Sequence, residues 1–387
     1  MRVLILSCNT GGGHNSCAAA IAEAFAENGI YTRTEDSLAF VSHGFANFMS
    51  KGHSLMYRRF PAVFKFGYGF AEKHSSFLAK GSLVYKLLTS GAEKLYSYIT
   101  ENEFDTIICV HVFCGMILEK AFEGKSKNGI KTAFIATDYT CSPGAASFDY
   151  DYYFIPDNSL AGEFIANGVP EEKIIPSGIP VRKNFICRIE KEKAKAAFCL
   201  CGKRHLLIMG GSMGCGPVEK ILEYLHKDIT ADTDISVVCG NNRKLYKKLY
   251  SKYKTAKNIH IMGFATDVPL LMDSADLYLT KPGGLCTSEA LAKVLPMVMI
   301  DAVAGCEKHN MEYFIKICGG ESAPTPKTLA KKCSLLLSDE EKLELLRNNL
   351  MQNQKNNAAA EISDYLGGAI CKSFLRKEIT ENSDFAD

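Results

Sequence analysis

Short apolar runs, separated by glycine turns and amphipathic stretches, recur along the chain. The first run, residues 3–7, leads into three consecutive glycines and then an alanine-rich stretch that ends at Gly29. Similar runs follow at 106–110, 132–136 and 152–156. Continuous apolar runs of this length are typical of parallel strands covered on both faces, and the longer stretches between them favour helices. The first half therefore predicts an α/β domain.

The second half of the chain restarts the same pattern. A strand is expected at 204–209, a glycine loop at 210–216 and a helix at 218–226, and further strand-and-helix units follow up to residue 301. Two successive series of such units predict two doubly wound, Rossmann-like domains that face a cleft. We predict an N-terminal domain at residues 1–187, a linker at 188–203 and a C-terminal domain at 204–354. A last helix at 355–379 is expected to return to the N-terminal domain, and residues 380–387 are expected to form a disordered tail.

Composition narrows the class of protein. The net charge is +2 and 47% of residues are hydrophobic, so the chain can bury large cores and has no overall field that attracts nucleic acid. The fifteen cysteines are odd in number and lack a Cys-x-x-Cys pair, which favours reduced thiols in the cytosol. No apolar run reaches the roughly 18 residues of a membrane span, and the N-terminus lacks the pattern of a signal peptide. We expect a protein that is soluble or lies on a membrane surface.

A histidine lies in the turn of the first strand-turn-helix unit. Gly12 and Gly13 precede His14 at the carboxyl end of a strand, where open α/β sheets bind ligands and glycines let a ligand approach the backbone. An imidazole there can take a proton from an alcohol, since its ordinary pKa is about 6.5. Two other interpretations stay open: His14 caps the helix, or the turn is an incomplete dinucleotide-binding fingerprint without its third glycine.

A second candidate site follows the strand expected at 277–280. A Pro-Gly-Gly turn breaks this strand before a helix, so free backbone N–H groups and the positive end of the helix dipole suit a phosphate. Glu289 lies in the first helical turn, where its carboxylate can accept two hydrogen bonds from a vicinal diol such as a ribose. The polar residues 305–310 follow the next strand, on the same rim. The alternative is that the turn is only a loop and Glu289 only a helix charge.

The strand expected at 132–136 leads into Thr137 and Asp138, which places Asp138 on the same rim as His14. Its carboxylate could orient or bind an acceptor hydroxyl, or it could cap the following turn. The glycine loop at 210–216 lacks the Gly-Lys-Ser/Thr sequence of an ATPase P-loop, so it is not one.

Residues 53–94 interleave aromatic rings with cations. Helical segments of this make-up can lie in a membrane interface, with apolar rings below and Lys or Arg toward anionic head groups. The alternative is an ordinary pair of amphipathic helices packed on the first domain, and no recognisable nucleic-acid module accompanies them. The residues that we single out for acceptor or membrane contact, besides Gly12 and Gly13, are Tyr57, Arg58, Phe64, Phe66 and Phe70.

Taken together, these motifs resemble one family. The chain is similar to the diacylglycerol glycosyltransferases, which include plant monogalactosyldiacylglycerol synthases and bacterial processive diacylglycerol glucosyltransferases, and more distantly to the peptidoglycan enzyme that adds N-acetylglucosamine to a lipid-linked intermediate. The matching pieces span residues 1 to 320 and are Gly11-Gly12-Gly13-His14, the aromatic stretch 57–70, Thr137-Asp138, the segments 154–156 and 178–180, Gly210-Gly211-Ser212, Lys281-Pro282-Gly283-Gly284, Ser288-Glu289-Ala290 and Glu307-Lys308-His309-Asn310.

The resemblance implies a GT-B fold and a metal-independent, inverting transfer from a UDP-sugar to diacylglycerol, without a cofactor. By matching position His14 would be the general base, with Asp138 as the second catalytic candidate. The implied donor contacts are Gly211, Ser212 and Met213 at the diphosphate, Gly263 and Phe264 at the uracil, Gly284 and Thr287 at the phosphates, Glu289 at the ribose, and Glu307 and Asn310 at the sugar. The chemistry agrees, because an attacking alcohol needs a base and helix starts can receive the charge of the leaving UDP.

The chain departs from the family on the acceptor side. Many relatives carry a histidine and a tryptophan after Thr137-Asp138, whereas this chain continues with residues 140–145, Thr-Cys-Ser-Pro-Gly-Ala, and contains no tryptophan. The sequence therefore leaves three acceptors possible: diacylglycerol, a glycosylated diacylglycerol and another lipid. It also does not distinguish glucose from galactose as the transferred hexose.

The sequence thus predicts an inverting hexosyltransferase of the cytoplasm, bound peripherally to the inner face of the cell membrane through anionic lipid. Three alternatives remain. The chain could transfer N-acetylglucosamine to a lipid-linked cell-wall intermediate, or isomerise a free sugar nucleotide as a UDP-N-acetylglucosamine 2-epimerase. It could also bind a UDP-sugar at the membrane without catalysis.

Overall fold

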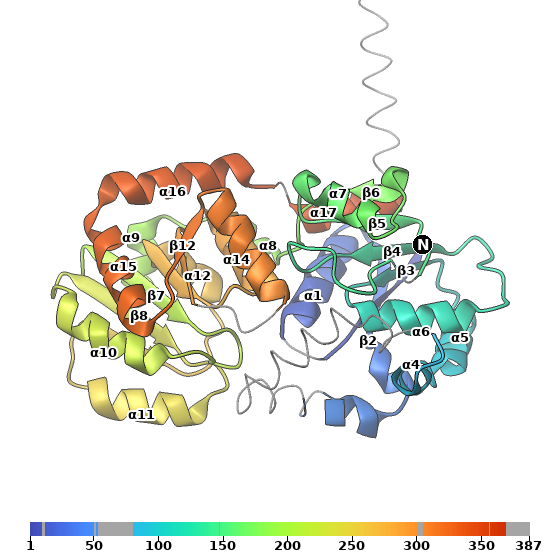
Figure 1. Cartoon of the computed structure of the whole chain (residues 1–387), viewed down its shortest axis with the longest axis horizontal. Helices are drawn as coiled ribbons and strands as arrows, with labels where there is room; N and C mark the ends of the chain where they lie inside the picture. The colour runs from blue at the N-terminus through green and yellow to red at the C-terminus, as the bar shows by residue number, and fades with distance from the viewer. Residues whose placement is uncertain are drawn as a thin grey trace, which may run out of the picture.

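The computed structural model describes residues 1–9, 12–49, 52, 80–146, 148–300, 305–355 and 357–368. The predicted membrane contacts Tyr57, Arg58, Phe64, Phe66 and Phe70, and the predicted tail, lie outside these ranges. The described chain forms two α/β halves side by side, each built on a parallel six-stranded sheet (Figure 1). The prediction of a GT-B fold with two doubly wound domains is confirmed.

The N-terminal sheet has the strand order β2-β1-β3-β4-β5-β6, with every pair parallel. The order reverses between β1 and β3, and in such sheets ligands bind at the carboxyl ends of the strands at this point. His14 follows the first of these two strands and His111 the second. The strands are β1 (Arg2–Ser7), β2 (Tyr31–Asp36), β3 (Thr106–Cys109), β4 (Lys131–Ile135), β5 (Tyr152–Phe154) and β6 (Ile174–Ile175).

The C-terminal sheet has the strand order β12-β11-β10-β7-β8-β9, again with every pair parallel. Its order reverses between β7 and β10, so the loops at 210–216 and 281–283 leave the sheet next to each other. The strands are β7 (Arg204–Met209), β8 (Thr233–Val238), β9 (Ile259–Met262), β10 (Leu277–Thr280), β11 (Met297–Met299) and β12 (Gly320–Ser322).

Helices cover both faces of each sheet. Those of the N-terminal half are α1 (Gly12–Glu27), α4 (Leu83–Leu88), α5 (Ala92–Glu101), α6 (Val112–Phe122), α7 (Ala161–Ala166) and α8 (Lys183–Ile186), with 3-10 turns η1 (Ser37–Phe40), η3 (Asn158–Leu160) and η4 (Glu171–Lys173). Those that follow are α9 (Lys191–Ala197), α10 (Val218–Asp228), α11 (Arg243–Tyr253), α12 (Val268–Ser274), α13 (Gly284–Lys293), α14 (Cys306–Lys316), α15 (Pro326–Ser338), α16 (Glu340–Asn353) and α17 (Ala358–Gly367).

The first strand is apolar at successive positions because both of its faces are covered. Val3 and Ile5 pack in one core with residues of α1 and α17, whereas Leu4 and Leu6 pack in another with α5 and α6. The last helix of the described residues, α17, thus lies on the N-terminal sheet although it follows the C-terminal half in sequence (Figure 1). Asn28 also donates to Ser363 Oγ at 3.0 Å.

The two chain crossings between the halves are tied together at the end of α13. Arg188, after α8, donates to the Ala292 carbonyl at 3.3 Å and to Gln354 Oε1 at 3.0 Å, and Gln354 donates to the same carbonyl at 2.7 Å. A buried ion pair between Lys293 and Asp273, 2.8 Å long, lies beside them. The helix that carries Glu289 is therefore fixed at its far end by both crossings. None of the helices in the described ranges combines the length and apolarity needed to cross a membrane.

Candidate active site

The loops that follow β1 and β7 meet where the two halves face each other. A methyl group added at Gly12 would lie 3.0 Å from Oγ of Ser212, and one added at Gly13 would lie 3.7 Å from Cβ of Leu285. Residues 12 and 13 belong to the N-terminal half and residues 212 and 285 to the C-terminal half. The predicted acceptor side and the predicted diphosphate side are therefore in contact.

His14 lies in the first turn of α1 with its Nδ1 atom turned toward the protein. This nitrogen is 3.0 Å from the Val110 carbonyl oxygen and 3.2 Å from Oγ1 of Thr137. A carbonyl can only accept a hydrogen bond, so Nδ1 carries the proton in the neutral ring and Nε2 keeps its lone pair. Nε2 makes no hydrogen bond with any residue that the structure describes.

The surroundings keep this imidazole neutral. Burial lowers the pKa of His14 to about 4, and the hydrogen bond to Val110 opposes this shift only in part. The ring of His111 packs edge-on against it, with ring centroids 4.6 Å apart. At pH 7 His14 is thus neutral, and no described residue occupies the lone pair of its Nε2 atom, which is less basic than that of a free imidazole.

Asp138, after β4, lies at the boundary between the halves. Its Oδ1 atom accepts a hydrogen bond of 2.8 Å from the side-chain amide of Asn310, on α14, and it also receives one from the backbone of Gly284. Burial raises the pKa of Asp138 to about 6, and the nearby Glu307 carboxylate raises it further, while Asn310 and Lys281 oppose the shift. Asp138 is therefore joined to the C-terminal half at two points.

Asn310 connects three segments although the resemblance implied a sugar contact for it. Its side chain is fully buried, and its amide donates to Asp138 and to the Pro282 carbonyl at 3.0 Å. Its Oδ1 atom accepts from the backbone N–H of Tyr139 at 2.7 Å. In this structure Asn310 links the loop after β4 of the N-terminal half to the loop after β10 of the C-terminal half.

The start of α13 faces the N-terminal half more closely than the phosphate prediction anticipated. Thr287 is fully buried, and its hydroxyl lies 3.0 Å from the carbonyl oxygens of both Gly283 and Gly284, within its own helix. Gly284 lies against Thr137 and Asp138. Contact of a phosphate with Gly284 and Thr287 therefore remains a prediction that would require these two segments to move apart.

Substitution of Gly284 by alanine tests this contact. The added Cβ would lie 1.9 Å from the Thr137 carbonyl oxygen and 2.9 Å from Oδ1 of Asp138, so the two halves must shift. Because a displacement of about 1 Å at an active site can lower a rate about a hundredfold, we expect a loss of this size in kcat/KM for Gly284→Ala. The matched control is Gly162→Ala, on α7, where no atom lies within 4 Å of the added methyl group. Equal activity of the two variants would contradict the close approach.

Glu289 is the sixth residue of α13, because the helix begins at Gly284, so the prediction that it lies in the first helical turn is wrong. It is a partly buried carboxyl group that accepts no hydrogen bond within the described parts of the chain. Burial raises its pKa to about 8, and the charge of Arg182 offsets this only in part. A carboxyl group that has lost its hydration and gained no donor is poorly stabilised in its charged form. It is suited to a ligand that brings hydroxyl donors.

The loop after β7 presents backbone N–H groups. Gly211 has a φ angle of +70°, which favours glycine, and the turn is closed by hydrogen bonds from Gly214 to Gly211 and from Cys215 to Gly210, of 3.0 and 2.9 Å. The amides of Ser212 and Met213 have no acceptor in the described ranges. Successive N–H groups at such a turn form a concave anion site.

The remaining predicted donor contacts lie on two separate segments of the C-terminal half. Gly263 follows β9, and its carbonyl accepts from Gly240 at 3.1 Å. The ring of Phe264 is 65% exposed and so is open to stacking. Glu307, in the first turn of α14, forms a partly buried ion pair with Lys281.

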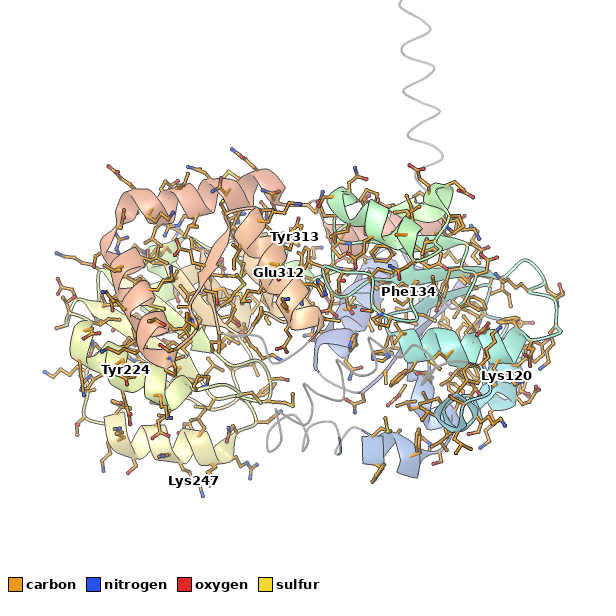
Figure 2. The ribbon with its side chains drawn as sticks, in the orientation of Figure 1. Lys120, Phe134, Tyr224, Lys247, Glu312 and Tyr313 are labelled. Atoms are coloured by element: carbon orange, nitrogen blue, oxygen red, sulfur yellow. The ribbon has the colours of Figure 1, made fainter. Side chains whose placement is uncertain are left out.

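Several residues of this boundary were given no role from the sequence. Tyr139 stacks on Tyr313, with ring centroids 4.2 Å apart, and its hydroxyl lies 3.0 Å from Oγ of Ser288. Tyr313 lies on the side of the C-terminal half that faces the N-terminal half (Figure 2). Strand-end polar residues can be picked out of a sequence, but partners from the other half depend on how the domains dock.

Comparison with known proteins agrees with this architecture. Residues 14–181 match the family model of monogalactosyldiacylglycerol (MGDG) synthase, and residues 220–357 match that of glycosyl transferases group 1. The processive diacylglycerol beta-glucosyltransferase of Staphylococcus epidermidis is 27% identical over 288 residues, which cover 74% of this chain and 70% of that protein. The chloroplastic monogalactosyldiacylglycerol synthase of Spinacia oleracea is 26% identical over 383 residues, 93% of this chain and 71% of that protein. The crystal structure of Acinetobacter baumannii MurG has a TM-score of 0.65 at 15% identity, covers 95% of this chain and 99% of its own, and shows the shared fold.

The two facing sheets, their strand-end loops and the two family matches define the chain as an enzyme, a glycosyltransferase of GT-B fold. More particularly, these matches confirm the resemblance noted in the sequence. The chain is similar to the monogalactosyldiacylglycerol synthases and the processive diacylglycerol glucosyltransferases.

Proposed function

We propose that this glycosyltransferase moves a hexose from UDP-glucose or UDP-galactose to diacylglycerol, or to a glycosylated diacylglycerol, with inversion and without a metal ion, at the inner face of the cell membrane. His14 is the general base. The observation that carries the proposal is the orientation of His14, whose Nδ1 proton is directed to the Val110 carbonyl at 3.0 Å while the loop that holds it touches Ser212.

The reaction requires a proton to leave the acceptor hydroxyl as the new glycosidic bond forms. Nε2 of His14 accepts this proton, and the ring becomes an imidazolium whose Nδ1–H bond to Val110 O stays in place. Asp138 lies near enough to the start of α13 to be linked to Gly284, and in our proposal it orients the acceptor hydroxyl. Because its pKa is raised to about 6, Asp138 is mostly ionised at neutral pH and able to accept a hydrogen bond.

The leaving UDP needs donors for its growing negative charge. In our proposal the free amides of Ser212 and Met213 supply them, with Gly284 and Thr287 completing the phosphate site once the halves separate locally. Phe264 stacks beside the uracil with Gly263, Glu289 accepts from the ribose, and Glu307 contacts the sugar. Asn310 serves this site through Asp138 and Pro282 rather than by contact with the sugar.

The test is a lipid-extraction assay. Purified protein is incubated with diacylglycerol in anionic mixed micelles, EDTA and radiolabelled UDP-glucose or UDP-galactose in separate tubes. We expect a labelled glycolipid with one donor, unaffected by EDTA. Loss of the product with EDTA would overturn the metal-independent mechanism.

The same assay separates the alternatives. Labelled lipid formed only with UDP-N-acetylglucosamine and a polyprenyl-linked acceptor would indicate a cell-wall enzyme. A free isomerised sugar nucleotide, made without lipid, would indicate a 2-epimerase, and UDP-sugar binding without any product would indicate a binding protein. Each of these results contradicts the proposed function.

A further inference from the structure

Helix α11 and the residues after it carry a local excess of positive charge. Between residues 243 and 257 the sequence contains seven lysines and arginines and no acidic residue, whereas the whole chain has a net charge of only +2. Like charges at helical spacing repel each other by a few tenths of a kcal/mol per pair. An anionic partner would offset the part of this repulsion that acids of the protein itself do not.

The packing of α11 turns its cations outward. Leu249 and Tyr253 are buried in the core of the C-terminal half, and their side of the helix is therefore the inner one. Lys248 and Lys252 bind Glu219 and Glu223 of the neighbouring helix α10. The cations that remain are exposed and form no ion pair with the residues that the structure describes; they are Arg243, Lys244, Lys247, Lys254 and Lys257.

An aromatic pair borders these cations. The rings of Tyr246 and Tyr250 are stacked, with centroids 5.7 Å apart, and Tyr250 is 50% exposed. Tyrosine is favoured at membrane interfaces, because its ring is apolar and its hydroxyl is hydrated. In Figure 2, Lys247 lies on the outer side of α11, away from the rest of the molecule.

Helix α11 shares one edge of the molecule with a helix of the N-terminal half. In Figure 1, α11 and the helix 43–49 of the N-terminal half lie along the same edge of the molecule. Phe48, on the latter helix, is 71% exposed. A cationic patch on one half and an exposed ring on the other could rest on the same flat surface.

We propose that the outer face of α11 is a docking surface of the C-terminal half for an anionic lipid bilayer. The patch comes from a different part of the sequence than the aromatic segment 53–94, and it ties the sugar-nucleotide half to the surface. The choice of a bilayer rests on the proposed function, in which the acceptor is a membrane lipid; the binding itself is independent of catalysis and can be measured without it.

The experiment is flotation of the full-length protein with vesicles of phosphatidylcholine containing one-third phosphatidylglycerol, compared with pure phosphatidylcholine. The test variant carries Lys244→Gln, Lys247→Gln and Lys254→Gln. The control carries Lys316→Gln, Lys327→Gln and Lys331→Gln, three exposed lysines on α14 and α15 with no ion pair in the described ranges. Both variants lose the same charge.

A lysine near an anionic surface contributes about fivefold in affinity, so the test variant should bind the anionic vesicles about 100-fold more weakly than wild type, while the control keeps most of its affinity. Added salt should weaken wild-type binding. Equal binding by the two variants would overturn the proposal, as would tighter binding of wild type to a single-stranded RNA homopolymer than to the vesicles. Transferase activity in detergent micelles is measured separately. If it is absent while α11-dependent vesicle binding persists, only the proposed function fails.

Discussion

Replacement of His14 by alanine should lower kcat for glycosyl transfer by about 10²- to 10⁴-fold, the usual contribution of a positioned general base. The affinity for the UDP-sugar should be unchanged, because the predicted donor contacts lie on the other half. His14→Asn should lose as much, since its amide can still donate to Val110 O, which is 3.0 Å from Nδ1 in the wild type, but offers no basic nitrogen. Steady-state kinetics and calorimetric titration with the UDP-sugar measure the two quantities.

The matched control for this prediction is His226→Ala, an exposed histidine on α10. It should keep wild-type activity. If His14→Asn retains more than about a tenth of the wild-type kcat, the proton goes elsewhere and Asp138 becomes the candidate base. If both His14 variants lose the UDP-sugar affinity as well, His14 is instead a structural residue of the boundary between the halves.

The neutral state of His14 can be measured directly. Burial lowers its pKa to about 4, compared with an ordinary value near 6.5, so the ring should remain neutral at pH 6. NMR of protein labelled at the histidine ring should show a titration midpoint near pH 4 that is missing in His14→Asn. By linkage, the folded state binds fewer protons at this ring than the unfolded state, so this group destabilises the fold progressively as pH falls from 6.5 to 4. A midpoint near 6.5 would contradict the burial.

The strands that line the site could be predicted because they are continuous apolar runs. The bounds of β7 and β10 agree with the sequence-based ranges. The edge strand β2 was not predicted, because its residues Tyr-Thr-Arg-Thr-Glu-Asp are largely exposed and mostly polar. Nor were β12, which is only three residues long, and α15, which begins at Pro326. Elements whose burial depends on neighbours in the tertiary structure leave a weak periodic signal.

The site could be predicted only where one local motif was sufficient. Strand-end positions singled out His14 and Asp138 on the rim of the first sheet, and the helix after the Pro-Gly-Gly turn singled out Glu289 in the other half. The sequence could not indicate that Asn310 is bound to Asp138, 172 positions away, or that Gly284 lies against Thr137. These contacts follow from the docking of two separate domains, which no local pattern encodes.

Replacement of Glu289 by glutamine should stabilise the protein and weaken its binding of the donor. The folded-state pKa of Glu289 is raised from 4.5 to about 8, so the folded state holds a proton that the unfolded state releases. The stability due to this protonation is complete below pH 4.5 and is lost as pH rises to 8. Glutamine is neutral throughout, so at pH 8 the variant should be more stable by about 2 kcal/mol, a value reduced for partial exposure of the side chain.

Donor binding should change in the opposite direction. Two ribose hydroxyls that donate to the ionised carboxylate lower its pKa, so binding of UDP-glucose to wild type at pH 7 should release a proton, and affinity should rise with pH up to about 8. Glutamine has a single acceptor oxygen, and the loss of a charged hydrogen bond should weaken binding about 10- to 100-fold and abolish the proton release. Calorimetry in buffers of different ionisation enthalpy measures both.

The exposed Glu172→Gln, on η4, is the control and should change neither stability nor binding. A Glu289→Gln protein that is less stable than wild type would mean that the carboxyl group serves the fold. If the variant is more stable but its affinity for UDP-glucose is unchanged, the carboxylate of Glu289 does not bind the ribose and has another role. The proposal requires all three results together: higher stability, weaker donor binding and loss of the proton release. They would show that Glu289 lowers the stability of the free protein, and that a hydroxyl-bearing ligand supplies the hydrogen bonds that its carboxylate lacks.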